Sequence, residues 1–260
     1  MVRKAGLTSL LLFGFVSTAL ASEGGFTWSH LLLGWLEHPL VSMGVDPLPI
    51  LDMLFVAVAI IVLAYIGGKP FRESEMVEPT GKVSLSYVME VIVSGILNLL
   101  SGIIKHGVGA RALLPLLGTY AIFIACMNLL GLVPGFNPPT DQFNVTIALG
   151  LIIFVATHVL GFRIHGSHYI QQFLGPIPWL SPLMLPIELI SHCVRPMSLA
   201  IRLFGNMTGD HKVVAVFTTI AAIALPIPFM GLGILVSVLQ AFVFVVLSAI
   251  YFEGAMGEAH

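Results

Sequence analysis

Long apolar stretches, separated by short polar connections, run along most of this chain. A helix needs about 20 consecutive apolar residues to cross the hydrocarbon core of a bilayer. Stretches of about this length or longer lie at 50–67, 112–133, 144–162, 186–225 and 227–252. The pattern predicts an all-α polytopic membrane protein with about five membrane-crossing helices.

Two segments depart from a simple upright bundle. Residues 84–107 mix apolar and polar positions, which predicts an amphipathic helix lying along the membrane interface. The stretch 186–225 is too long for an ordinary span, because about 40 helical residues extend about 60 Å, roughly twice the hydrocarbon thickness. We therefore expect it to tilt steeply, to bend at Pro196 or to curve across another object in the membrane. With 227–252 it would form a long, strongly tilted hairpin.

Composition agrees with a membrane protein. Hydrophobic residues make up 57% of the chain and charged residues 9%, whereas soluble domains contain about 25% charged residues. The mean hydropathy is +1.01. Cys126 and Cys193 both lie in apolar segments, which favours small buried side chains over a disulfide or a metal site.

The N-terminal residues resemble a targeting signal. A basic start, an apolar run and an Ala-Leu-Ala end make 1–21 a predicted signal peptide, with a retained first helix as the alternative. The expected domain organisation continues with an extracytoplasmic segment at 22–49, a membrane domain at 50–253, and a cytoplasmic tail at 254–260.

The basic residues orient the membrane domain. The connections at 22–49, 134–143 and 226–228 contain no Lys or Arg. The other connections carry the basic residues, and the positive-inside rule therefore places these on the cytoplasmic side, with the N-terminus outside and the C-terminus in the cytoplasm. The residues concerned are Lys69, Arg72, Lys82, Lys105, Arg111 and Arg163.

Arg202 lies in the middle of an apolar stretch, where inserting an arginine costs roughly 2.5–3.5 kcal/mol. Its guanidinium group stays protonated, so it can pair with a carboxylate but cannot carry protons. Hydrogen bonding between helices would explain Asn206 but not Arg202, since no acid of this chain lies obviously opposite it. On a helix the following residues share the face of Arg202 within about 40°: Glu188, Ser191, Arg195, Ser198, Asn206 and Gly209.

The last apolar stretch has a matching polar face. Gln240 and Tyr251 are separated by nearly three whole helical turns, and Gly233 lies on the same face. A hairpin could set this face beside Arg202, with polar groups approaching the arginine from both membrane surfaces. Ions could then reach the middle of the membrane from each surface without passing straight through the membrane.

The segment Ser198-Leu-Ala-Ile-Arg-Leu-Phe-Gly-Asn206 resembles the signature of subunit a of the rotary F-type ATP synthases. Three further segments match in the expected order: Met127-Asn-Leu-Leu-Gly-Leu-Val-Pro134, Asn144-Val-Thr146 and Leu239-Gln-Ala-Phe-Val-Phe244. The resemblance implies a stator subunit with two offset half-channels that pass protons to and from a carboxylate of the c-subunit ring.

The same resemblance implies roles for individual residues. Arg202 faces the ring carboxylate, favours proton release there and prevents leakage between the half-channels. Glu188 lines the cytoplasmic half-channel, and His211 lies in the outer one. The residues expected along the proton path are Glu188, Ser191, Asn206, Asp210, His211, Gln240 and Tyr251.

One position departs from the family. In the family, a second titratable residue often lies seven positions before the glutamine that corresponds to Gln240. In this sequence that position is Gly233. The outer path would then rest on His211, Asp210 and water. A histidine with a near-neutral pKa can relay protons, although an ordinary hydrogen-bonded role for His211 stays open.

The implied partners are the c-subunit ring, b-type peripheral stalk subunits, the rest of the ATP synthase and membrane lipid, in a bacterial inner membrane. The chain has no nucleotide-binding motif, so we expect no catalytic site of its own, no cofactor, no metal and no nucleic acid. Two other functions stay open: a self-contained ion channel or transporter, and a haem-binding anchor using His158, His192 and His211. The sequence does not decide between protons and sodium ions, because the carrying carboxylate belongs to another chain.

Overall fold

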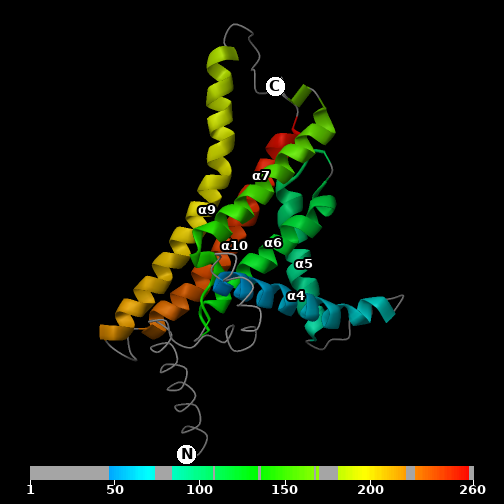
Figure 1. The fold of residues 1–260 in the computed structure, drawn as a ribbon. Helices are drawn as coiled ribbons and strands as arrows, with labels where there is room; N and C mark the ends of the chain where they lie inside the picture. Colours follow the sequence, from blue (N-terminus) through cyan, green and yellow to red (C-terminus); the bar gives the residue numbers. More distant parts are fainter. Residues whose placement is uncertain are drawn as a thin grey trace, which may run out of the picture. The chain divides into compact units, whose positions relative to one another are not determined.

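The computed structural model describes residues 47–73, 84–107, 109–133, 136–166, 168–169, 181–220 and 226–257. Helices make up these residues almost entirely, and none of them forms a strand. The elements, labelled in Figure 1, are α4 (Pro47–Glu73), α5 (Leu85–Ile103), α6 (Ala110–Leu130), the short 3₁₀ helix η2 (Pro139–Asp141), α7 (Phe143–His165), α9 (Ser181–Ile220) and α10 (Pro226–Met256). The predicted all-α class is therefore confirmed. The predicted signal peptide, nearly all of the segment 22–49 and the last residues of the tail lie outside the described residues.

Five helices of the described residues are long and apolar enough to cross a membrane. Four of them coincide with stretches predicted from the sequence. The fifth is Leu85–Ile103, of which 6% is buried inside the structure. We expected this helix at the interface; its length and composition also permit a crossing, so the interfacial location stays a prediction.

Helix α9 confirms the unusual length expected from the sequence. It runs for 40 residues, although it begins and ends about five residues earlier than predicted. Pro186 and Pro196 both lie inside it. A proline has no N–H, so Pro196 leaves the carbonyl of His192, four residues earlier, without its usual helical donor. Charged and polar side chains interrupt the apolar sequence of α9, which keeps it out of the set of five.

The described residues form two compact units, and the division falls inside α4, α6, α7, α9 and α10. Unit 1 contains 47–58, 123–133, 136–145, 203–220 and 226–240. Unit 2 contains 59–73, 84–107, 109–122, 146–166, 168–169, 181–202 and 241–257.

A buried polar network holds unit 1 together. The Asn128 side chain, near the end of α6, donates from Nδ2 to the Ser237 carbonyl of α10 at 3.3 Å. Its Oδ1 accepts from the Thr140 hydroxyl of η2 at 2.8 Å. All three residues are fully buried. The network explains why an asparagine stands in an apolar helix, since a buried amide requires hydrogen-bond partners.

Close helix packing defines unit 2. At Gly150 of α7, a Cβ atom would lie 2.8 Å from the carbonyl oxygen of Pro196 in α9, so a glycine is needed for this approach. Tyr120 of α6 stacks on Phe244 of α10, with ring centroids 5.9 Å apart. Within this unit, α9 is thereby held close to α7 at Pro196, and α6 is held against α10.

Candidate functional site

Arg202 is exposed at the surface of its unit, as is the neighbouring Ile201, which is 53% exposed. No carboxylate among the described residues of that unit forms an ion pair with the arginine. Further along the predicted face, Ser191 of unit 2 and Asn206 of unit 1 are exposed, and Glu188 is partly buried. Within each unit the polar face thus lies on a surface surrounded by apolar side chains, and a partner could supply the acid that Arg202 lacks.

In unit 1, α9 and α10 are linked by a hydrogen bond between two predicted site residues. The Asn206 amide donates from Nδ2 to Oε1 of Gln240 at 2.7 Å. Gln240 is buried, with 4% of its surface exposed. The pairing of the two polar faces within this unit is therefore confirmed.

Asp210 occupies the space beside Gly233 in the same unit. A Cβ atom at Gly233 would lie 2.5 Å from Oδ2 of Asp210 and 3.0 Å from Leu132. The carboxylate of α9 thus fills the place where α10 lacks a side chain. The next residue, His211, has a buried Nε2 atom with no hydrogen-bond partner among the described residues.

A further acid, which the sequence did not single out, lies in unit 1. The Thr208 hydroxyl of α9 donates to the carboxylate of Asp141 in η2. Asp141 follows two prolines at 138 and 139 in a connection without Lys or Arg. The position of this acid in an acidic, proline-rich connection was the signal that the sequence offered. Its contact with α9 could not be predicted, because the contact depends on how η2 folds back.

Unit 2 holds the other end of the predicted face. Oε1 of Glu188 lies 3.3 Å from Nε2 of His192, one helical turn further along α9. The Arg195 guanidinium lies over the ring of Tyr251 in α10, with Cζ 5.4 Å from the ring centroid, as in a cation–π contact. Tyr251, predicted from its spacing to Gln240, therefore meets the α9 face through Arg195.

Two histidines of unit 2, both named above in the haem alternative, lie together. The rings of His158 in α7 and His192 in α9 have centroids 5.2 Å apart. Both line a small pocket together with Arg195 and Tyr251. Its cavity volume is about 10 Å³, which is enough for about one water molecule. A porphyrin does not fit into that space, which argues against haem between these two rings.

The chemistry available to these residues is proton transfer and charge stabilisation. Asp210, His211, Glu188 and His192 can exchange protons, whereas a guanidinium group cannot. Among the described residues, no group of three or more His, Cys, Asp or Glu side chains could hold a metal ion. A fixed positive charge flanked by proton-exchanging groups is therefore the distinctive feature of α9.

Comparison with known proteins gives consistent matches. The family model described as ATP synthase A chain matches residues 50–253. The "ATP synthase subunit a" of Trichlorobacter lovleyi is 50% identical over 173 residues, covering 66% of this chain and 74% of that protein. That of Geobacter sulfurreducens is 46% identical over 182 residues, covering 70% and 77%. An "ATP synthase subunit a 1" of Pelobacter propionicus is 46% identical over 177 residues, covering 68% and 76%.

Proposed function

Because the chain belongs to the ATP synthase A chain family and is thus a component of the F0 membrane sector, we propose that it forms two offset half-channels for protons. These half-channels deliver protons to a carboxylate of the c-subunit ring and remove them again, so that proton flow is coupled to ring rotation. The chain carries no catalytic site of its own in this proposal; ATP is made elsewhere in the complex.

The observation that carries the proposal is the exposed arginine on an apolar surface. An unpaired charge in the hydrocarbon region is costly, and such residues face a partner or a water-filled cavity. Among the described residues of its unit, no acid forms an ion pair with Arg202. A ring carboxylate would supply the missing charge, and the guanidinium group would keep that carboxylate ionised while the arginine faces it.

Polar groups support a separate path on each side of the arginine. Asn206, Asp210, His211 and Gln240 belong to unit 1, and we assign them to the outer half-channel. Protons entering there neutralise a ring carboxylate, which can then rotate into lipid at lower cost than a charged group.

The cytoplasmic half-channel is formed by the residues of unit 2 on the same helix pair. Glu188, Ser191 and Tyr251 receive the proton after nearly a full turn of the ring. The transmembrane potential contributes about 2.3 kcal/mol per charge per 100 mV. Arg202 makes flow obligatory through rotation, because it separates the two paths and conducts nothing itself.

The protein is a multi-pass bacterial membrane protein. We propose an N-terminus outside and a C-terminus in the cytoplasm, as the distribution of basic residues indicates. The proposed direct partners are the c-subunit ring, along the exposed face of α9, and b-type subunits of the peripheral stalk. A self-contained channel would instead carry ions when reconstituted alone, and a haem anchor would show haem absorbance after purification.

The test removes the arginine. In Arg202→Ala we expect loss of proton-driven ATP synthesis while the complex still assembles in the membrane. Arg111→Ala, which removes an exposed arginine at the start of α6, is the matched control and should keep synthesis. Vesicles of the Arg202→Ala variant that retain normal ATP-driven proton pumping would contradict the assignment.

A further inference from the structure

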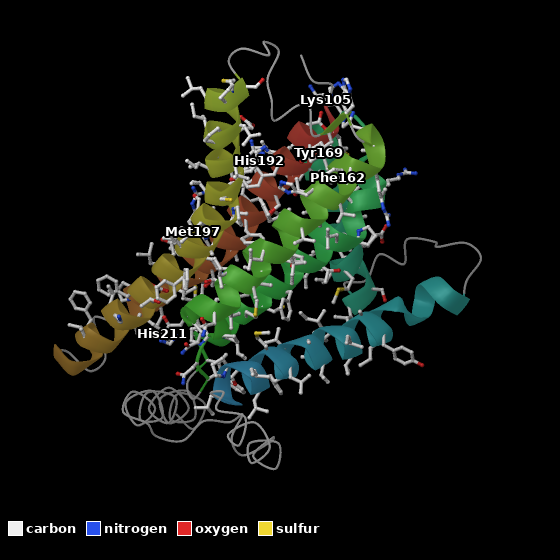
Figure 2. All side chains as sticks on the ribbon, turned by 45° about the horizontal axis from the view of Figure 1, so that its top comes forward. Lys105, Phe162, Tyr169, His192, Met197 and His211 are labelled. Carbon is white, nitrogen blue, oxygen red and sulfur yellow. The ribbon has the colours of Figure 1, made fainter. Side chains whose placement is uncertain are left out.

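Two histidines of unit 2 have no part in the proton path described above. His158 of α7 and His192 of α9 meet with their rings inclined by 72°. His192 is 9% exposed and lies on the side of α9 that faces the pocket shared with α7 and α10 (Figure 2). One imidazole of this pair is buried and the other half-buried, which requires polar partners in a chain this apolar, because each ring carries two polar nitrogen atoms.

The histidine pair is joined directly to Glu188. The His192 Nε2 atom lies 3.3 Å from the Glu188 carboxylate, and the side chains are 11% and 37% exposed, respectively. The contact therefore leads from a partly accessible carboxylate to a buried imidazole. His158, on the neighbouring helix, continues this line away from α9.

The hydrogen bond of His158 fixes which of its nitrogen atoms can accept a proton. Its Nδ1 atom lies 2.9 Å from the carbonyl oxygen of Phe154. A carbonyl oxygen only accepts, so Nδ1 is the protonated nitrogen and donates this bond. In the neutral ring, Nε2 is left as the acceptor.

Charged and titratable groups surround His192 on several sides. Glu188 and Arg195 come from α9, His158 from α7 and Tyr251 from α10. The carboxylate favours a protonated imidazole, whereas the guanidinium and a second protonated imidazole disfavour it. Groups of opposite influence therefore face His192 within this unit.

Tyr169, after α7, contacts the far side of the pair. Its ring centroid lies 6.0 Å from that of His158. Burial raises the pKa of the Tyr169 hydroxyl, and the positive charge of Arg195 partly opposes this. The hydroxyl therefore stays neutral in the physiological range and adds no charge to the cluster.

We propose that His192 and His158 form a proton relay that extends the path beyond Glu188. The proposal rests on the proposed function, in which Glu188 receives protons from the ring. It adds two proton-carrying residues and a route out of the cytoplasmic half-channel through the pocket between α7, α9 and α10.

Each step moves one proton and changes no other bond. The protonated Glu188 carboxyl donates to Nε2 of His192, which leaves a carboxylate and an imidazolium. The imidazolium releases its Nδ1 proton to the water that the pocket can hold, and from there the proton passes to Nε2 of His158. His158 then releases this Nε2 proton to water on the cytoplasmic side, because its Nδ1 proton stays in the hydrogen bond to Phe154. A turn of the His192 ring, or proton exchange through the same water, restores its first tautomer.

The experiment uses the whole ATP synthase in inverted membrane vesicles, whose bath is the cytoplasmic side. ATP synthesis is measured at a fixed ion gradient while the bath pH is varied. The variants are His192→Gln and His158→Gln, which keep a polar side chain but do not titrate. His106→Gln is the matched control, because it removes another histidine that pairs with a glutamate, Glu253, outside the cluster.

If the relay is correct, the His192→Gln rate falls at least about tenfold, in keeping with the usual contribution of a positioned proton-transfer group. The wild-type rate should also decline as the bath is acidified, because a protonated imidazole cannot accept another proton. This decline should disappear in both variants of the pair and persist in His106→Gln.

A second readout separates proton transfer from packing. His192→Ala leaves a cavity the size of the missing ring, and added imidazole should restore part of the rate in this variant but not raise the wild-type rate. A slowed variant that keeps the wild-type pH dependence and gains nothing from imidazole would show a packing role and overturn the relay. So would an unchanged rate in His192→Gln. If His192→Gln fails to assemble, His158→Gln and the imidazole experiment decide.

Glu188→Gln distinguishes failure of the relay from failure of the proposed function. Slow synthesis in Glu188→Gln with normal synthesis in His192→Gln would overturn the relay alone. Normal synthesis in Glu188→Gln would remove the carboxylate from the path and overturn both.

Discussion

Replacing Gly233 by alanine probes how α9 meets α10 in unit 1. The added Cβ would lie 2.5 Å from Oδ2 of Asp210 and 3.0 Å from Cδ2 of Leu132, whereas ordinary contacts begin at 3.4 Å. The Asp210 carboxylate must therefore move by roughly 1 Å. Overpacking costs about 1–3 kcal/mol, and the better helix propensity of alanine returns about 1 kcal/mol. We expect a net destabilisation of about 0–2 kcal/mol.

The effect on transport should exceed the effect on stability. A displacement of about 1 Å in a group that takes part in a transfer can reduce a rate by up to about 100-fold. In Gly233→Ala we expect ATP-driven proton pumping to fall about tenfold, with the complex still assembled. Pumping is measured in vesicles and assembly by recovery of the intact complex.

Gly231→Ala is the control for this prediction. It adds a methyl group two residues away on the same helix, where nothing lies within 4 Å of the new Cβ. Its pumping should match wild type. Equal pumping in Gly233→Ala and Gly231→Ala would refute the view that Asp210 is held in place by the missing side chain of Gly233.

Two further predictions concern packing within the units. Gly150→Ala brings a Cβ to 2.8 Å from the Pro196 carbonyl oxygen, a backbone atom that cannot turn away; we expect about 1–3 kcal/mol of overpacking and a lower melting temperature of the detergent-solubilised complex. Thr140→Val keeps the shape of the side chain but leaves the buried Asn128 Oδ1 without the Thr140 hydroxyl; we expect about 1–3 kcal/mol of destabilisation in the same assay.

Each of these two has a control in the chain. Gly102→Ala in α5 meets no atom within 4 Å, so it should leave the melting temperature unchanged or slightly raised. Thr119→Val removes an exposed hydroxyl that bonds its own helix and should have little effect. A melting temperature for Gly150→Ala or Thr140→Val equal to that of its control would contradict the packing described for that unit.

The sequence predicted the helices and the pairing of two polar faces, because both depend on local periodicity. The long helix α9 follows from a mostly apolar stretch of about 40 residues, which stays helical although Pro186 and Pro196 lie inside it. The spacing of polar residues placed Asn206 and Gln240 on the facing sides of their helices, where they form a hydrogen bond. The Glu188–His192 contact was also readable, since residues four apart share a helix face.

Contacts that depend on the register between distant helices could not be predicted. His158 and His192 lie on helices whose relative shift is set by the close approach of Gly150 and Pro196. The place of the Asp210 carboxylate beside Gly233 likewise depends on side-chain volumes across α9 and α10. Periodicity states which face a residue occupies, but not which residue of the partner helix lies opposite.

The buried network of unit 1 has a consequence for biogenesis. The Asn128 amide obtains its acceptor from Ser237, which is synthesised more than a hundred residues later. While the chain is being inserted, α6 must hold an amide group in the membrane before α10 exists, and an unmatched amide there favours other polar partners. A chain truncated before α10 would never receive the Ser237 acceptor. Completion of the last helix therefore supplies the missing acceptor and joins α6 to α10 within unit 1.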